Sequence, residues 1–165
     1  MSSRDEEFLE FARSRAAPLH RSAYLLCGDW HLAHDLVQDT FVKAYRHWHR
    51  VQQADSSDAY IRRILLNEAR QRWRRRDKAM PVANVTHEAA VLDATDDIVR
   101  RAGLLQALLT LPLRQRATVV LRYLEGMTER ETAAALGCSE GTVKSQTSRA
   151  LTSLRNFLDR TESTL

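Results

Sequence analysis

Residues 127–158 read MTERETAAALGCSEGTVKSQTSRALTSLRNFL, and their pattern predicts two helices joined by a tight turn. Thr128 and Glu131 have the spacing of a capping box, in which each side chain satisfies a backbone donor at the helix start. Gly137 permits the turn because glycine adopts positive φ angles without steric cost, and Ser139 can cap the second helix. The apolar residues at helical spacing in that helix are Val143, Ala150, Leu151 and Leu154. This stretch is predicted to be a helix-turn-helix.

The second helix of this motif begins with small polar residues, which suit an approach to DNA. In a helix-turn-helix the second helix lies in the major groove, with residues near its start against the base edges. Lys144 and Arg149 can donate to guanine or phosphate, and Gln146 can pair with adenine. Ser145 and Ser148 can donate or accept. The alternative is a helical hairpin with a solvated polar face.

The rest of the chain also has the pattern of helices. Glycine (five) and proline (three) are scarce, and no stretch alternates as a strand does. A first helix is expected over about residues 5–26, with Pro18 kinking it or starting a second helix. Asp29 is expected to cap a helix that runs to about residue 50. Its expected buried positions are Leu36, Val37, Phe41, Ala44, Tyr45 and Trp48.

Three further helices are expected before the helix-turn-helix. One starts at a cap formed by Ser57 or Asp58, and another covers about residues 97–109. The third has Pro112 in its first turn and is closed by Gly126. Residues 79–97 contain Pro81 and acidic residues without an apolar stripe, which is typical of a linker. The predicted fold class is all-α, with two small helical domains joined by a flexible linker. The predicted domains are residues 1–78 and 98–165, with 79–97 as the linker.

Charge is distributed unevenly along the 165 residues, whose net charge is +4. Residues 1–40 carry four basic and seven acidic side chains, whereas residues 62–78 carry eight basic and two acidic ones. Residues 79–99 hold four acidic side chains and no Lys or Arg. Such segregation indicates a polyanionic partner for part of the surface and a different partner for the rest.

The basic block coincides with the helix YIRRILLNEARQRWRRRDK, residues 60–78. Its charge attracts a nucleic-acid backbone, and Tyr60 and Trp73 offer faces on which unpaired bases can stack. Asn67 offers a hydrogen-bonding edge that could read an exposed base. The alternative is a solvated basic helix whose aromatic residues belong to the core.

An acidic face is predicted on the helix that contains DLVQDTF, residues 35–41. Asp35, Gln38 and Asp39 lie together there, opposite Phe41 and Trp48. Lys43 can partly offset the charge of Asp39. This face could dock a basic protein surface, and the alternative is an ordinary solvated face.

Catalytic and metal motifs are missing from the sequence, which contains no Gly-rich phosphate loop, G-x-S-x-G or H-E-x-x-H. Cys27, His31 and His34 could be imagined as metal ligands, but Gly28 and a helix start separate them, so packing and surface roles are favoured. We therefore expect no enzyme activity, cofactor or metal. No apolar run of membrane-spanning length or signal peptide is seen, and the two cysteines suit a reducing compartment, so a cytoplasmic protein is expected.

Taken in order, three segments resemble one family over about residues 20–77 and 98–158. They are CGDWHLAHDLVQDTFVKAYRHW, AYIRRILLNEARQRWRRR and the stretch from LPLRQRATVVLRYLEG to the end of the helix-turn-helix. This order and spacing resemble bacterial extracytoplasmic-function sigma factors of the sigma-70 family, most closely their actinobacterial subgroup. The resemblance implies a transcription initiation factor that binds core RNA polymerase, recognises promoter DNA and promotes its melting.

The resemblance also implies roles for residues. Contacts to the β′ clamp helices of the polymerase fall on Asp35, Gln38 and Asp39, and the β flap is a second contact on the enzyme. Recognition of the −10 element falls on Arg63, Asn67, Arg70, Trp73 and Arg74. Recognition of the −35 element falls on Thr142, Lys144, Ser145, Gln146, Ser148 and Arg149.

Two more expectations follow from the family. An anti-sigma protein is an expected partner: the sequence shows no extended C-terminal sensory domain, so regulation is expected to come from such a separate protein or from the expression level. Many relatives carry Arg at the position of Gln146, so the −35 sequence preference is expected to differ here.

Three other classes of protein compete with this interpretation. A helix-turn-helix regulator would bind duplex DNA on its own and would not need the DLVQDTF helix followed by an arginine-rich helix. A recombinase-like enzyme would need clustered carboxylates or a nucleophile. A protein-only adaptor would not need the basic helix or the reading helix.

Overall fold

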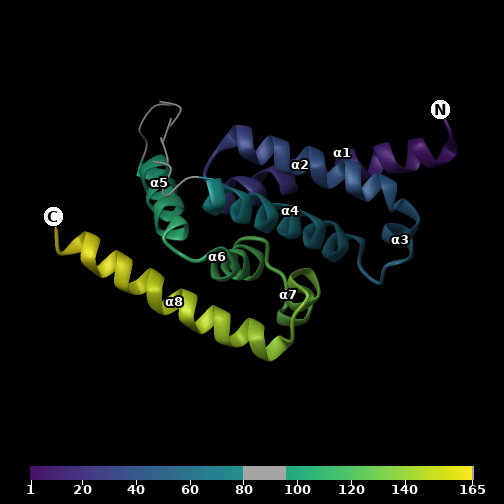
Figure 1. The fold of residues 1–165 in the computed structure, drawn as a ribbon. Coiled ribbons are helices and arrows are strands. Elements are labelled where there is room, and N and C mark those ends of the chain that lie inside the picture. Colours follow the sequence, from purple (N-terminus) through teal and green to yellow (C-terminus); the bar gives the residue numbers. More distant parts are fainter. Residues whose placement is uncertain (80–95, 165) are drawn as a thin grey trace.

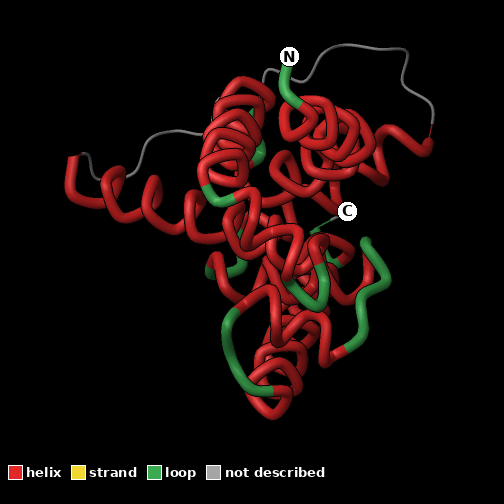
Figure 2. Tube along the Cα trace, turned by 90° about the vertical axis from the view of Figure 1, so that its right-hand side faces the viewer, coloured by secondary structure: helices red, strands yellow, loops and turns green. Residues whose placement is uncertain are grey.

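The computed structural model describes residues 1–79 and 96–164, and within these ranges the chain folds into helices without a strand (Figures 1 and 2). In chain order the elements are α1 (Ser3–Cys27), α2 (Trp30–Arg46), α3 (Trp48–Gln53), α4 (Ser57–Ala79), α5 (Asp96–Leu109), α6 (Leu113–Val119), the π-helical turn η1 (Val120–Leu124), α7 (Glu129–Leu136) and α8 (Glu140–Glu162). The all-α prediction is confirmed. The predicted linker falls almost entirely on residues 80–95, which lie outside the described residues.

The N-terminal half, α1–α4, packs around one apolar core. Leu26, Leu36 and Leu65 are each at most 1% exposed in it, and burial of such a side chain contributes about 1.5–3 kcal/mol. The indole of Trp48 closes one end, where its ring lies 5.3 Å from that of Phe8 in an edge-to-face arrangement. This core fixes the relative orientation of α2 and α4, which carry two of the three predicted contact surfaces.

Helix boundaries in this half agree with the sequence at some points and differ at others. Gly28 ends α1 with φ 73°, and the Asp29 side chain caps α2, as predicted. Helix α1 continues through Pro18 without a second helix start. The predicted helix from Asp29 to about residue 50 is divided at His47, where α2 ends and α3 begins. Tyr45 is 39% exposed, so its predicted place in the buried stripe is wrong.

The cap of α4 is also one residue away from the predicted position. The Ser56 side chain, rather than that of Ser57 or Asp58, accepts a bond from the backbone N–H of Ala59 at 3.1 Å. The Ser57 hydroxyl instead donates to the carbonyl of Val51. Because Ser, Asp and Asn are all good caps, neighbouring candidates cannot be distinguished from local sequence alone.

In the C-terminal half, α5–α8, the predicted helix-turn-helix is confirmed in its local geometry. The capping box between Thr128 and Glu131 is formed in both directions, at 3.1 and 2.7 Å. Gly137 ends α7 with φ 66°, and Ser139 caps α8. Val143 and Ala150 are fully buried, but Leu151 is 36% exposed, contrary to its predicted burial.

The two halves pack against each other. Helix α7 lies against α4, and α5 lies against α1, as Figure 1 shows. Helix α8 extends along α5–α7 on the side away from α1 and α2. No helix of the described ranges combines the length and apolar character needed to cross a bilayer.

Candidate functional site

The reading face of the helix-turn-helix is the start of α8, and most of it is open to solvent. Val143, Thr147 and Ala150 share the side that packs on α6 and α7. Of the predicted −35 residues, Lys144, Ser145, Ser148 and Arg149 are exposed on the other side, whereas Thr142 and Gln146 are half-buried at its edges. The arrangement presents a row of donors on one helix face, as a major-groove contact requires.

Two of these residues already have partners in the fold. The backbone N–H of Thr142 donates to the Ser139 hydroxyl at 3.1 Å, so Thr142 belongs to the helix cap as well as to the reading face. The Lys144 ammonium lies 3.7 Å from a carboxylate oxygen of Glu129, and the two side chains are 66% and 36% exposed, respectively. An exposed pair at this distance contributes little, so Lys144 is available to another anion.

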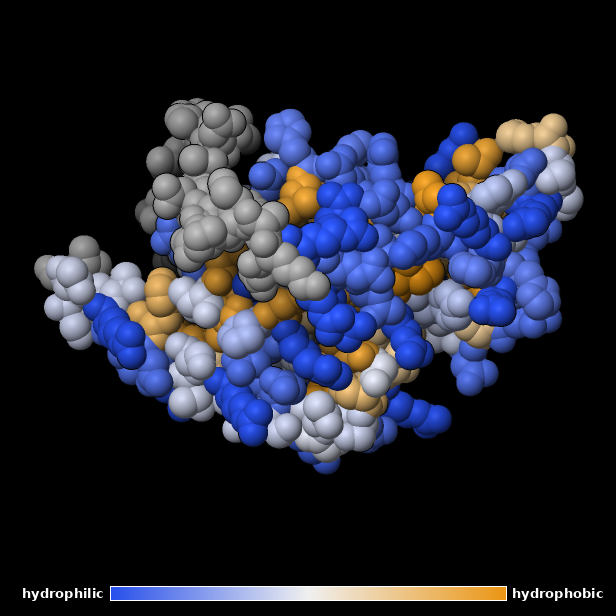
Figure 3. Space-filling view, in the orientation of Figure 1, coloured by the Kyte–Doolittle hydropathy of each residue, from blue (hydrophilic) through white to orange (hydrophobic). Residues whose placement is uncertain are grey.

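A second set of predicted residues forms one stripe along α4, which we call the α4 stripe: Arg63, Asn67, Arg70 and Arg74. Their spacing of four, three and four residues puts them on one side of the helix, and all four are exposed. Hydrophilic side chains also predominate over α2 and α4 on the face shown in Figure 3. The stripe has three guanidinium groups and one amide, a combination suited to phosphates and one base edge.

Trp73 does not share the exposure of the stripe. Its ring is half-buried against the N-terminal core, and the guanidinium carbon of Arg116 lies 5.6 Å from the ring centroid. Tyr60 also packs on this core. For both aromatic residues the structure agrees with the core role that the sequence left open.

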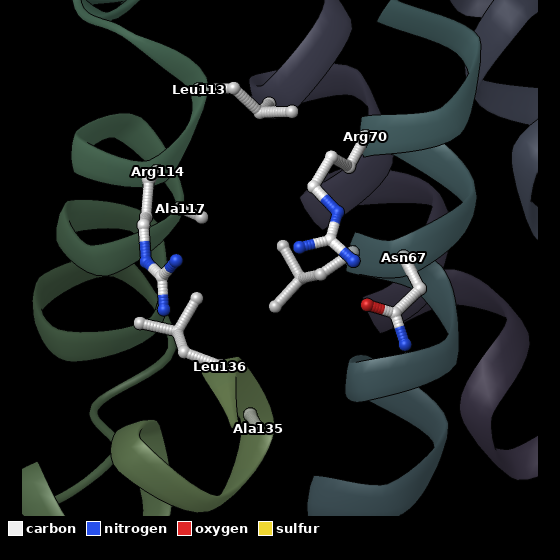
Figure 4. A pocket seen from close by; sticks show the side chains of 8 residues that line it. Asn67, Arg70, Leu113, Arg114, Ala117, Ala135 and Leu136 are labelled. Carbon is white, nitrogen blue, oxygen red and sulfur yellow. The ribbon is translucent and has the colours of Figure 1, made fainter. Parts of the chain in front are cut away.

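The α4 stripe faces the C-terminal half. Residues of α4, α6 and α7 line a cavity of about 190 Å³ between the two halves (Figure 4). Next to it, a β-carbon at Gly137 would lie 3.2 Å from the Arg63 guanidinium. Helix α7 therefore occupies the space beside one end of the stripe.

The acidic face of α2 is partly committed to contacts within the chain. Asp35 and Gln38 are exposed, but Asp39 forms an ion pair with Arg72 of α4 at 2.5 Å. Lys43 pairs with the buried Glu68 rather than compensating Asp39. The most accessible part of this face is therefore Asp35 with Gln38.

Two charged residues that hold the halves together were not identified from the sequence. Arg116 is 5% exposed. Its guanidinium donates to the carbonyl oxygens of Leu108 at 2.9 Å and Leu111 at 2.8 Å, and to that of Leu26 in α1. Burial lowers the pKa of Arg116 to about 10, so it is charged at neutral pH. A buried cation can be held here because helix ends offer carbonyl oxygens and negative dipole ends.

Glu125 is the second of these residues. Its carboxylate accepts from the Ser22 hydroxyl of α1 and pairs with Arg62 of α4. Burial raises the pKa of Glu125, and Arg62 offsets part of that shift. One signal was present in the sequence: Arg116 and Glu125 stand four residues from Val120 and Leu121, respectively, and so lie in phase with the apolar stripe.

The residues considered as metal ligands do not form a site. No group of three or more His, Cys, Asp or Glu side chains converges among the described residues. Cys27 is buried, which raises the pKa of its thiol to about 11. The two ring nitrogens of His34 contact His20 and Gln38. These contacts are compatible with the packing and surface roles.

Comparison with known proteins shows the family to which the chain belongs. A family model for sigma-70 region 2 matches residues 11–79, and one for sigma-70 region 4 matches residues 101–154. The chain is 41% identical to the RNA polymerase sigma-E factor of Streptomyces avermitilis over 153 residues, which are 93% of this chain and 86% of that protein. The chain belongs to the extracytoplasmic-function sigma factors of the sigma-70 family. It is therefore a transcription initiation factor.

Other relatives agree with this assignment. The ECF RNA polymerase sigma factor SigM of Mycobacterium tuberculosis is 33% identical over 151 residues, which cover 92% of this chain and 76% of that protein. The sigma factor RpoE of Bartonella quintana, solved with the anti-sigma factor NepR, is 28% identical with a TM-score of 0.70, covering 93% of this chain and 98% of that one. CnrH, solved with the cytosolic domain of CnrY, is 25% identical with a TM-score of 0.68, covering 94% and 90%.

The sigma-factor prediction is thereby confirmed. The alternative of a helix-turn-helix regulator that acts alone is not favoured, because region 2 is present together with region 4.

Proposed function

We propose that this sigma factor binds core RNA polymerase and contacts promoter DNA through two separate surfaces, the α4 stripe at the −10 element and the start of α8 at the −35 element. The observation that carries the proposal is that one chain presents two exposed rows of donors, one in each half. Residues 1–78 would act as the −10 and polymerase-binding domain and residues 98–165 as the −35 domain, with 79–97 between them.

At the −10 element, Arg63, Arg70 and Arg74 hold backbone phosphates, and Asn67 pairs with the edge of an unstacked base. Neutralised phosphates release counterions, which supplies affinity without sequence preference. Unstacking a base step costs a few kcal/mol, and holding the extruded base offsets part of this cost without ATP. Trp73 supports α4 by packing on the N-terminal core, where its ring is half-buried. No enzyme activity of the chain is needed.

At the −35 element, the donors at the start of α8 enter the major groove. Lys144 and Arg149 hold phosphate or guanine, and Gln146 favours adenine. Thr142, Ser145 and Ser148 complete the contact at the helix N-terminus. Because Gln146 is half-buried at the edge of the face, we expect it to affect sequence preference more than overall affinity.

The polymerase would contact both halves. Asp35, Gln38 and Asp39 face the β′ clamp helices, with Asp39 sharing its charge with Arg72. Leu151 and Leu158 of α8 are 36% and 52% exposed and offer an apolar surface for the β flap. An anti-sigma protein is a further proposed partner, since the similar sigma factor RpoE of Bartonella quintana was solved with the anti-sigma factor NepR. A protein that works with bacterial polymerase acts in the cytoplasm.

The −10 contact requires this packed arrangement of the two halves, which we call closed, to open. Helix α7 lies against α4, so the side chains of the α4 stripe, although exposed to solvent, have room for a DNA strand only when the C-terminal half moves away. Docking of both halves on one large enzyme supplies the avidity that can offset the lost contacts.

Footprinting tests this proposal directly. With core polymerase, the protein should protect the −35 region and render thymines at the −10 region reactive to permanganate. Alone, at the same concentration, it should protect neither. Strong −35 protection by the free protein, with no effect of polymerase, would instead support a regulator that acts alone.

A further inference from the structure

The cavity between the two halves contains an unusual combination of side chains for a packing defect. Its floor is apolar and includes Leu66, Leu113 and Leu136, while Asn67, Arg70 and Arg114 provide polar groups. Figure 4 shows the guanidinium groups of Arg70, from α4, and Arg114, from α6, on opposite walls of this space. No carboxylate is among the residues that line it.

The two arginines differ from their neighbours in their ion pairing. Among the described residues, neither guanidinium forms an ion pair, whereas Arg62 and Arg72 of the same helix α4 are both paired with carboxylates. Two cations on opposite walls repel each other when the cavity is empty, which disfavours closure. A single anion between them converts this repulsion into two charge-assisted contacts.

We propose that this cavity binds a small organic anion, with one carboxylate or phosphate group on an apolar body of one or two rings. The anionic group lies between Arg70 and Arg114, and the apolar body rests on the three leucines. The volume of about 190 Å³ is below the ~300 Å³ at which pockets for drug-sized molecules begin. A compact ligand is therefore required.

Binding at this site is linked to closure of the molecule, because the walls come from both halves. A ligand that needs α4 on one side and α6 and α7 on the other binds only the closed arrangement and raises its population. It also covers Asn67 and Arg70. Such an anion therefore keeps the sigma factor from engaging the −10 element, a consequence that rests on the function proposed above.

Calorimetry on the full-length protein with 2-naphthoate tests the site without polymerase or DNA. We expect one binding site per chain. Arg114→Gln should weaken binding about tenfold or more, since a hydrogen bond to a charged group is lost. Arg13→Gln, on an exposed arginine of α1, is the matched control and should leave affinity unchanged. The neutral analogue 2-naphthalenemethanol should not bind measurably.

Three results would overturn the site: no binding of 2-naphthoate, equal binding by Arg114→Gln, or equal binding of the neutral alcohol. Transcription with core polymerase tests the consequence: 2-naphthoate should inhibit the wild type and spare Arg114→Gln, which keeps its basal activity. Binding without inhibition would overturn the link to closure. If calorimetry shows binding but the wild type directs no transcription without 2-naphthoate, the proposed function fails and the anion site stands.

Discussion

Arg116 shows how one residue can join two halves of a chain. Its guanidinium is buried among carbonyl oxygens from α1 and from the end of α5. Carbonyl groups at helix ends lack the full set of backbone partners, so the cation and the carbonyls help to satisfy each other. Nothing in the sequence assigned a role to this arginine, because its acceptors come from residues far away in the chain.

Arg116→Met should therefore destabilise the fold by about 3 kcal/mol, because several buried acceptors lose their donor. The measurement is the urea midpoint of the full-length protein. Arg114→Met, two residues earlier on an exposed side chain of the same helix, is the control and should stay within about 0.5 kcal/mol of the wild type. An unchanged midpoint for Arg116→Met would show that water replaces the guanidinium at no cost.

The buried carboxyl group of Glu125 should make the free energy of unfolding depend on pH. Its pKa in the folded protein is raised above 4.5 by burial, so the folded state holds this proton more tightly than the unfolded state. The contribution of Glu125 to stability is then fully present below pH 4.5 and is lost as pH rises through the raised pKa. Glu125→Gln removes the titrating group and with it this pH-dependent contribution to stability. Unfolding free energies from pH 4.5 to 7 should show the wild type losing stability relative to Glu125→Gln, and parallel curves would contradict the assignment.

Lys144 and Arg149 are the two residues of the reading face whose substitution tests the −35 contact. Lys144→Ala and Arg149→Ala should each weaken −35-dependent transcription while polymerase binding is unchanged. If the side chain holds a phosphate, each variant should also lower the salt slope of promoter binding by about 1. Arg160→Ala, near the end of α8, is the control. Unchanged promoter strength would remove both residues from the reading face.

Among the helices and turns, two glycines in different backbone conformations should respond to alanine with opposite changes in stability. Gly137 has φ 66°, and a β-carbon there would lie 3.2 Å from the Arg63 guanidinium, whereas Gly103 in α5 has nothing within 4 Å. Gly137→Ala should destabilise by about 1 kcal/mol or more. Gly103→Ala should stabilise by up to about 1 kcal/mol, because alanine is the better helix former. Thermal unfolding of the two variants measures both effects. Shifts of the unfolding midpoint that are equal and of the same sign would show that the backbone conformation of the glycines does not decide the outcome.

Elements were predictable where their causes are local. The capping box, Gly28, Gly137 and the cap at Asp29 depend on a few neighbouring residues, and each was found as predicted. The division at His47 was not predictable, since both sides of it have helical patterns. Tyr45 fits the apolar spacing of α2, but its hydroxyl instead donates to Asp5 at the surface. Burial depends on neighbouring helices, which the local pattern does not contain.

At the scale of the whole molecule, the arrangement of the halves could not be read from the sequence. The contacts that close it join residues far apart in the chain, such as Ser22 with Glu125 and Leu26 with Arg116. Most of the predicted contact residues lie on exposed helix faces, because exposure follows from helical periodicity, whereas Trp73, Thr142 and Gln146 are half-buried. That the α4 stripe would face α7 required the three-dimensional structure.

The acidic face of α2 gives a prediction about assembly. Asp35→Arg combined with Asp39→Arg should abolish binding to core polymerase, because both charges facing the clamp helices are reversed. The loss of the Asp39–Arg72 pair should cost less than about 1 kcal/mol, since both side chains are partly exposed. Glu10→Arg, on an exposed position of α1, controls for charge alone. Normal competition of the double variant for polymerase would exclude this face.

The two halves of this sigma factor should direct polymerase to promoters together. Transcription of a genomic fragment library by bacterial core polymerase, with and without the full-length protein, tests this. Discrete new transcripts should appear, and their start sites should share upstream −35 and −10 elements. If the folded protein produced no such transcripts and bound duplex DNA by itself, the two halves would not act together with polymerase.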